Sequence, residues 1–523
     1  MIAILTCVVS LAMHPVPVAT AIPPAQAEQR AVLGPRVTRE MMAAAYLRVD
    51  RTLRTRLESG TLSVDERRDL NRRFDSVTML FFSGRFAEAI PTLNGLALAG
   101  TDRPVAEIEA IRTALDQIYE VEPRLLQTPR EGERMPWVSL HATPLGETAT
   151  IVPARTPLAI RTPSGELVPI GDWTEPFAWP AACGASGQYE IVLPTPGLAA
   201  VGHAGGIALS TVTLMPEPAS AVGARLNERL AGFERDGLGR EGDRAALASL
   251  LALLRDELSP TKSASFLADR HALSVRATRE AEEIAKGESP WIGFRGEAWR
   301  TIRAVAIDVP CRILVPASIP PAAEASEKPP LVIALHGAGG DESMFLDGYG
   351  AGLLGELAER HRFAVVTPLT TAFAPSPVAF DAIVDEMERI AGIDRRRVSV
   401  IGHSMGAMAA ARVAELRSER IAGIALIAGG GDPRPRDRPP PPTLLVAGGL
   451  DPLFPVERME AMAKEMALRY GEAKVPFASR TFPDDGHTLV VTAALAETIE
   501  WLLSQPPVAS ASTDAPPESP QRP

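Results

Sequence analysis

Cysteine is scarce in this chain of 523 residues, which has only three: Cys7, Cys183 and Cys311. No pair of them has the Cys-x-x-Cys spacing, and this excludes the metal sites that depend on it. If a leader that contains Cys7 is removed, the other two either form one disulfide or stay as separate thiols, and the sequence leaves both options open. We expect no metal and no organic cofactor.

An excess of positive charge is also missing. The chain has 53 Lys and Arg residues against 64 Asp and Glu residues, a net charge of −11. Proteins that bind nucleic acid need a basic surface to contact phosphates. We therefore expect no nucleic-acid partner.

The N-terminal apolar run is too interrupted for a membrane anchor. It extends from Ile2 to Ala21, contains His14, Pro15 and Pro17, and is followed by Ala-Gln-Ala at 25–27 before the first charged residue. A spanning helix needs about 20 unbroken apolar residues, whereas a small-x-small end is typical of a secretory cleavage site. The pattern predicts a signal peptide and an exported protein, periplasmic or extracellular, with no stable membrane anchor.

The length predicts two or three domains, because single cores seldom extend far beyond about 150 residues. Helical spacing of apolar residues alternates along the chain with short β-branched runs separated by Pro and Gly. The predicted order is a signal peptide (1–27), a helical region (28–135), a small β-sandwich-like module (136–216), a second helical region (217–294), a region of alternating strands and helices (295–504) and a disordered tail (505–523).

The region 295–504 has the pattern of an α/β protein. Short apolar runs alternate with helical patterns, which is typical of a mostly parallel sheet covered on both faces. The predicted buried strands are 331–335, 363–367, 398–401, 421–427, 443–447 and 478–482, and the predicted helices are 353–362, 377–391, 405–417 and 456–470.

One of these strands leads into Gly402-His403-Ser404-Met405-Gly406 and then into an Ala-rich helix. A serine on so sharp a strand-to-helix turn needs small neighbours two residues away on each side. The turn also directs the helix N-terminus at the position where an anionic oxygen forms during acyl transfer. The motif therefore predicts a nucleophilic serine, Ser404.

Three further motifs follow the order expected of such a site. The strand 331–335 ends in His336-Gly337-Ala338-Gly339-Gly340, a turn whose backbone N–H groups can face the serine. Asp451 follows the strand 443–447, and His487 lies in the loop after the strand 478–482. The chain order Ser, acid, His is the one that α/β hydrolases use. Asp432 is the competing acid, and His403 and His336 are expected to have structural roles.

With these motifs, residues 299–503 resemble the α/β-hydrolase family, and within it the secreted feruloyl-esterase and polyhydroxybutyrate-depolymerase type. The residues that carry the resemblance are the glycine turn, Asp394-Arg395-Arg396-Arg397-Val398 and the Gly402–Gly406 elbow. The resemblance implies Ser404 as nucleophile, His487 as base and Asp451 as its partner. It also implies an oxyanion hole from the N–H groups of Met405 and Ala338.

Three functions remain open at this point. The first is an exported serine hydrolase that cleaves small or polymeric carboxylic esters through an acyl-enzyme. The second is a serine peptidase of the prolyl-oligopeptidase type, although the preceding segment lacks the repeats of a β-propeller. The third is a binding module in 28–294 that contacts carbohydrate or protein, with Trp173 and Trp179 as a sugar platform or as core residues.

Overall fold

The computed structural model describes residues 37–509, except for 131, 146–155, 196–204, 255–268, 306, 321–326 and 375. The predicted signal peptide and most of the predicted tail lie outside these residues. None of the described helices combines the length and the apolar character needed to cross a membrane.

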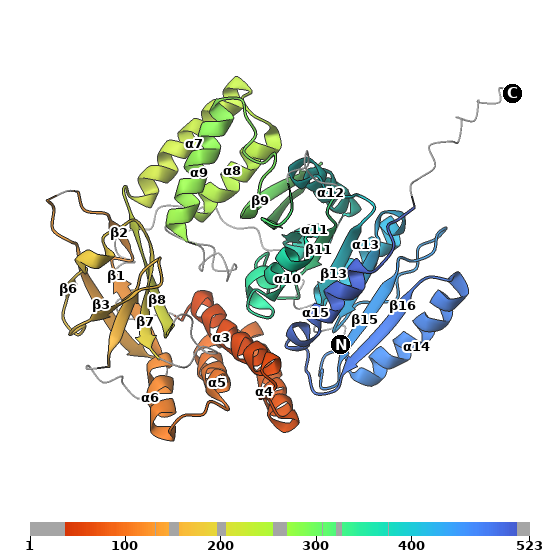
Figure 1. Cartoon of the computed structure of the whole chain (residues 1–523), viewed down its shortest axis with the longest axis horizontal. Helices are drawn as coiled ribbons and strands as arrows, with labels where there is room; N and C mark the ends of the chain where they lie inside the picture. The colour runs from red at the N-terminus through yellow and green to blue at the C-terminus, as the bar shows by residue number, and fades with distance from the viewer. Residues whose placement is uncertain are drawn as a thin grey trace. The chain divides into compact units, whose positions relative to one another are not determined.

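Four helices open the described chain: α3 (Arg39–Glu58), α4 (Val64–Phe82), α5 (Phe86–Leu98) and α6 (Val105–Leu115) (Figure 1). A capping box starts α4, because the Ser63 hydroxyl accepts the Glu66 N–H while the Glu66 carboxylate accepts the Ser63 N–H. Strands begin directly after α6, at Gln117, which is earlier than the predicted boundary of 136. This first strand is short and interrupted by glutamates, so its alternation is a weak sequence signal.

The β module consists of two small sheets. One has the order β1 (Gln117–Glu122), β3 (Trp137–Pro144), β6 (Phe177–Ala178), and the other has the order β2 (Leu125–Gln127), β8 (Gly206–Met215), β7 (Gly187–Pro194), β4 (Leu158–Arg161), β5 (Leu167–Ile170). All neighbours are antiparallel except β2 and β8.

The tryptophans of this module belong to its interior. Trp173 and Trp179 are buried, and their indole N–H groups donate to the carbonyls of Thr156 and Cys183. They are therefore core residues and offer no stacking surface for a sugar. The Cys183 and Cys311 side chains are both buried, and no disulfide joins them.

A second group of helices follows: α7 (Ala219–Asp236), α8 (Glu241–Leu253) and α9 (Arg270–Ala285). They pack against one another through a leucine-rich core and lie side by side in Figure 1. α8 also contacts the first strand of the C-terminal sheet.

That sheet has eight strands in the order β16-β15-β14-β13-β11-β12-β10-β9. The strands are β9 (Gly296–Ala304), β10 (Ile307–Val315), β11 (Leu331–Leu335), β12 (Ala364–Pro368), β13 (Val398–His403), β14 (Gly423–Ile427), β15 (Thr443–Gly448) and β16 (Phe477–Phe482). β11 to β16 are mutually parallel, whereas β10 is antiparallel to both of its neighbours. The fold class predicted from the sequence, an α/β sheet preceded by helices and a β module, is confirmed.

Helices cover both faces of this sheet. They are α10 (Leu353–His361), the short α11 (Thr370–Phe373), α12 (Pro377–Ala391), α13 (Met405–Arg417), α14 (Val456–Ala473) and α15 (Val490–Leu503). Alternate residues of β11 point to opposite faces: Ile333 packs with the core that includes α12 and α13, and Val332 with the core that includes α10 and α15. The carboxyl ends of the parallel strands are thereby left to carry the loops of the site.

Candidate active site

The turn between β13 and α13 holds Ser404 in a strained backbone conformation, with φ 54° and ψ −115°. The turn needs glycine at two positions because the backbone atoms of neighbouring segments come very close to them. A Cβ on Gly402 would lie 2.2 Å from the carbonyl oxygen of Gly406, and a Cβ on Gly406 would lie 1.9 Å from that of Leu335. The strand and helix therefore meet only because these positions have no side chain.

Ser404, His487 and Asp451 form a hydrogen-bonded chain. The Ser404 Oγ lies 3.0 Å from His487 Nε2, and His487 Nδ1 lies 2.8 Å from Asp451 Oδ2. Because a carboxylate accepts, Nδ1 carries the proton and Nε2 accepts the serine O–H. Ser404 remains partly exposed, whereas His487 and Asp451 are buried.

Asp451 is fixed on the side away from the histidine. Its Oδ1 accepts the N–H groups of Leu453 and Phe454 at 2.8 and 2.9 Å. The Phe454 ring is nearly parallel to the imidazole of His487, at 9° and 5.8 Å between centroids. One oxygen of the Asp451 carboxylate thus accepts from the backbone, and the other accepts from the imidazole.

The competing acid Asp432, and the two aspartates just before His487 in the chain, form ion pairs with arginines. Asp432 pairs with Arg434 at 3.0 Å and with an arginine of α14. Asp484 and Asp485 pair with two arginines of α4. Among the acids that the sequence offered, the structure brings Asp451 to His487 Nδ1.

The glycine turn after β11 lies against the serine. A Cβ on Gly337 would be 3.3 Å from the Ser404 Cβ and 2.8 Å from His403 Nδ1. Among the turn, loop and cap hydrogen bonds of the described backbone, none uses the N–H of Ala338 or Met405. These are the two N–H groups that the resemblance implied as an oxyanion hole.

His336 and His403 are buried, satisfied side chains. Burial lowers the pKa of both imidazoles, so both are neutral at pH 7. His336 Nε2 accepts the Thr370 N–H at 3.0 Å, while its Nδ1 donates to the carbonyl of the next residue. His403 Nε2 donates to the His487 carbonyl at 2.9 Å, and its Nδ1 accepts from the Tyr349 hydroxyl at 2.7 Å. His403 thus holds the backbone of His487, a contact that the sequence did not reveal.

The structure adds two residues of α4 that the sequence analysis missed. Asn71 Oδ1 accepts the N–H of Gly486, and Asp75 Oδ2 accepts the N–H of His487, both at 2.8 Å. Burial raises the pKa of Asp75 to about 6, against the opposing effect of its bonds to the histidine loop. The sequence signal for these residues is a repeat of polar side chains at every fourth position of the helix.

The helices α3 and α4 also contact the glycine turn after β11. Arg39 donates to the Gly339 carbonyl at 2.8 Å, and a Cβ on Gly339 would lie 2.5 Å from the Phe81 ring and 3.2 Å from the Phe82 ring. Phe82 is 43% exposed. The neighbourhood of Ala338 is thus built partly by residues from the start of the described chain.

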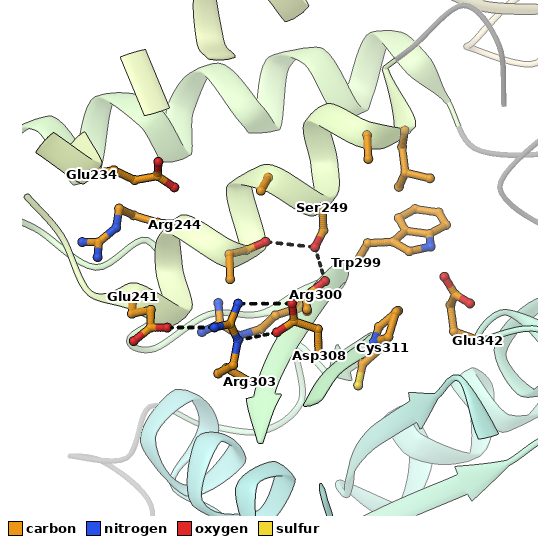
Figure 2. Close-up of a pocket in the computed structure, with 16 residues that line it drawn as sticks. Glu234, Glu241, Arg244, Ser249, Trp299, Arg300, Arg303, Asp308, Cys311 and Glu342 are labelled. Carbon is orange, nitrogen blue, oxygen red and sulfur yellow. Dashed lines mark hydrogen bonds and ion pairs between the residues drawn. The ribbon is translucent and has the colours of Figure 1, made fainter. Parts of the chain in front are cut away.

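A separate cavity of about 710 Å³ lies between α8 and the hairpin β9–β10 (Figure 2). Figure 2 shows Arg303 between two carboxylates of the lining: it pairs with Asp308 and, at 3.3 Å, with Glu241. Ser404, His487 and Asp451 do not line it. Within the described part of the chain, no group of three His, Cys, Asp or Glu side chains is arranged to hold a metal ion.

The sequence of residues 332–484 matches the model of the alpha/beta hydrolase family. No curated protein matches the chain. Similar solved structures include a thermostable esterase (25% identity, TM-score 0.33, 40% of this chain and 63% of that one). Another is an S-formylglutathione hydrolase from Staphylococcus aureus, with 15% identity and a TM-score of 0.32, over 40% of this chain and 99% of that one. A ferulic acid esterase has 14% identity and a TM-score of 0.31 over the same shares of the two chains.

The matched segment contains the glycine turn, the serine elbow and the strand that carries Asp451. It ends just before His487, which the sheet brings back to the serine. The C-terminal part of this chain is an α/β-hydrolase domain.

Proposed function

We propose that the protein is a serine hydrolase that cleaves carboxylic esters through an acyl-enzyme on Ser404. The observation that carries the proposal is the continuous chain from Ser404 Oγ to His487 Nε2 and from His487 Nδ1 to Asp451. This arrangement converts a weakly nucleophilic hydroxyl into one that loses its proton as it attacks.

In the first step, Ser404 Oγ bonds to the ester carbonyl carbon while His487 Nε2 takes the hydroxyl proton. The carbonyl oxygen becomes anionic and accepts from the N–H groups of Met405 and Ala338; one such donor is worth about 3 kcal/mol. The imidazolium then gives its proton to the departing alkoxide, and the alcohol leaves. Water repeats the sequence on the acyl-enzyme and releases the acid.

The proposal is tested with a fluorophosphonate probe and peptide mass spectrometry on the full chain. We expect one adduct, on Ser404, and none in Ser404→Ala, whose hydrolysis of p-nitrophenyl acetate should fall by about 10⁴-fold or more. A folded wild-type protein that stays unlabelled would overturn the proposal.

Ester rather than peptide cleavage is favoured by the segment before the domain. Its described residues form helices and two small sheets, not the repeated blades that accompany the peptidase alternative. Parallel assays with p-nitrophenyl esters and with peptide p-nitroanilides of the same acyl group distinguish the two. Faster cleavage of the anilides would reverse the assignment.

We also propose that the protein acts after export, on small or polymeric esters. The support is the sequence pattern of residues 1–27. Fractionation of cells that express the full chain tests this, together with N-terminal sequencing of the product. An uncleaved protein in the cytoplasm would contradict it.

A further inference from the structure

The histidine loop, residues 484–487, is bound along its whole length by one face of α4. The backbone N–H groups of Gly486 and His487 donate to Asn71 and Asp75, each at 2.8 Å. The remaining contacts come from the side chains of Asp484 and Asp485, which pair with two consecutive arginines one turn before Asn71 on the helix.

The spacing of the α4 residues makes this possible. Arg67, Asn71 and Asp75 are separated by four positions, so they lie on one face of the helix. Arg67 Nε bonds Asp485 at 2.9 Å, and Asn71 adds a bond of 3.3 Å to the same carboxylate. Asn71 and Asp485 have no exposed surface, and Asp75 is 9% exposed.

The loop is shaped to receive the helix. A Cβ on Gly486 would lie 2.1 Å from Asp75 Oδ2, so any side chain there would push the carboxylate away. A buried backbone N–H without an acceptor is costly. Removal of the Asp75 carboxylate would therefore leave the His487 N–H unsatisfied next to the reacting imidazole.

The backbone carbonyl groups of the histidine loop are held by the C-terminal domain itself. The His487 carbonyl accepts from His403, and the Asp485 carbonyl accepts from the Leu450 N–H at 2.9 Å. The carbonyl groups are thus held by the sheet, and the N–H groups of Gly486 and His487 by α4. Neither set alone fixes both sides of His487.

We propose that Asp75 and Asn71 of α4 are positioning residues for the base His487, so that the N-terminal helical region is an obligatory part of the hydrolase site. The proposal rests on the proposed function, because it assigns a purpose to the position of His487. It changes the meaning of residues 38–98: they complete the site instead of forming an independent binding module.

The test compares Asp75→Ala, Asp75→Asn and a control, Asp69→Ala, in the full chain. Asp69 is on the same helix, with a side chain 65% exposed. With p-nitrophenyl acetate we expect Asp75→Ala to lower kcat at least tenfold with KM within twofold, because the serine and the oxyanion donors are untouched. Asp75→Asn keeps an oxygen acceptor and should stay within about threefold of wild type, and Asp69→Ala should equal wild type.

Two further measurements separate the possible failures. Thermal unfolding shows whether each variant is folded at the assay temperature, and fluorophosphonate labelling of wild type tests the proposed function independently. If wild type is labelled on Ser404 but Asp75→Ala keeps its kcat, the positioning role is overturned. It is equally overturned if Asp75→Asn is as slow as Asp75→Ala, because the hydrogen-bond acceptor would then not be what matters.

Discussion

The two helical regions before the sheet look alike in sequence but use their buried polar groups differently. In the first, Asn71 and Asp75 accept backbone N–H groups of the loop that carries His487. In the second, Asp243 of α8 pairs with Arg300 of β9 and Arg389 of α12, at 3.4 and 3.1 Å. The first region contacts the loop that carries His487, and the second contacts the edge of the sheet.

The difference teaches that burial of charge does not by itself mark a functional contact. Arg300 is 1% exposed, less than Asp451 and His487 at 5% each, and lies over the Trp291 ring at 4.4 Å. Its partners are other charged side chains, so its removal affects stability. The α4 residues instead accept backbone N–H groups of the loop that places His487 beside Ser404.

The largest expected effect is on stability, at the second region. Arg300→Ala leaves the buried Asp243 and the partly buried Glu386 with one cation fewer, and removal of one partner of such a cluster costs about 3–5 kcal/mol. Urea unfolding measures this loss, and kcat of the folded fraction should be unchanged. Arg303→Ala, at an exposed pair with Asp308, is the control and should cost less than about 1 kcal/mol. If Arg300→Ala lowered kcat while keeping the stability of wild type, the second region would also affect the candidate site, and the difference between the two regions would be refuted.

The next largest effect is a pH-dependent change in the free energy of unfolding, and it concerns a residue of the first helical region. Asp50 of α3 is fully buried and accepts from the Tyr46 hydroxyl at 2.7 Å and from Thr492 of α15. Burial raises its pKa to about 6, partly offset by these bonds. Because the folded state holds the proton more tightly than the unfolded state, this group's contribution to stability is greatest below pH 4 and falls as the pH rises to about 6.

A rise of about two pKa units corresponds to roughly 3 kcal/mol. The free energy of unfolding of wild type should therefore fall, relative to Asp50→Asn, by up to that amount between pH 4 and pH 7. Urea titrations at several pH values measure the difference. A difference between wild type and Asp50→Asn that stays constant with pH would refute the assignment.

Asn71→Ala tests the first region at the site itself. It removes the acceptor of the Gly486 N–H and one bond to Asp485, so the histidine loop loses part of its support. We expect kcat to fall about tenfold, equivalent to about 1.4 kcal/mol of activation free energy, with a smaller change in KM. Asn227→Ala on the exposed face of α7 is the matched substitution in the other region. If both variants behave alike, the two regions are functionally equivalent.

The sequence predicted those parts of the site that are local. The glycine turn and the Ser404 elbow depend on glycines within a few residues, and the order of strands places Asp451 and His487 at the same sheet edge. The strands β11 to β16 and the helices α10, α12, α13 and α14 were predicted to within a few residues, whereas α11 and α15 were not predicted. The central strands were found because buried parallel strands are continuous apolar runs.

The contacts that escaped prediction join distant parts of the chain. Asp75 and His487 are 412 residues apart, and a polar residue every fourth position on a helix is normally a solvated face. The same holds for Asp243 and Arg389, 146 residues apart. A single sequence contains the periodicity of each element but not the pairing of their polar faces, so these contacts need the structure.

The smallest expected effect concerns substrate contact at the first region. The Phe82 ring, 43% exposed, lies beside Gly339 and so beside the Ala338 donor. Truncation to Ala removes apolar surface that a bound acyl chain would cover, and at about 25 cal/mol per Å² this is worth below 1 kcal/mol. We expect KM for p-nitrophenyl butyrate to rise about threefold, with less change for the acetate and kcat within twofold.

The control is Val105→Ala, which truncates an apolar side chain on α6 that is 73% exposed. An equal change for both esters would show that Phe82 acts on the turn rather than on the acyl chain, and the first region would then only position residues and not contact the substrate.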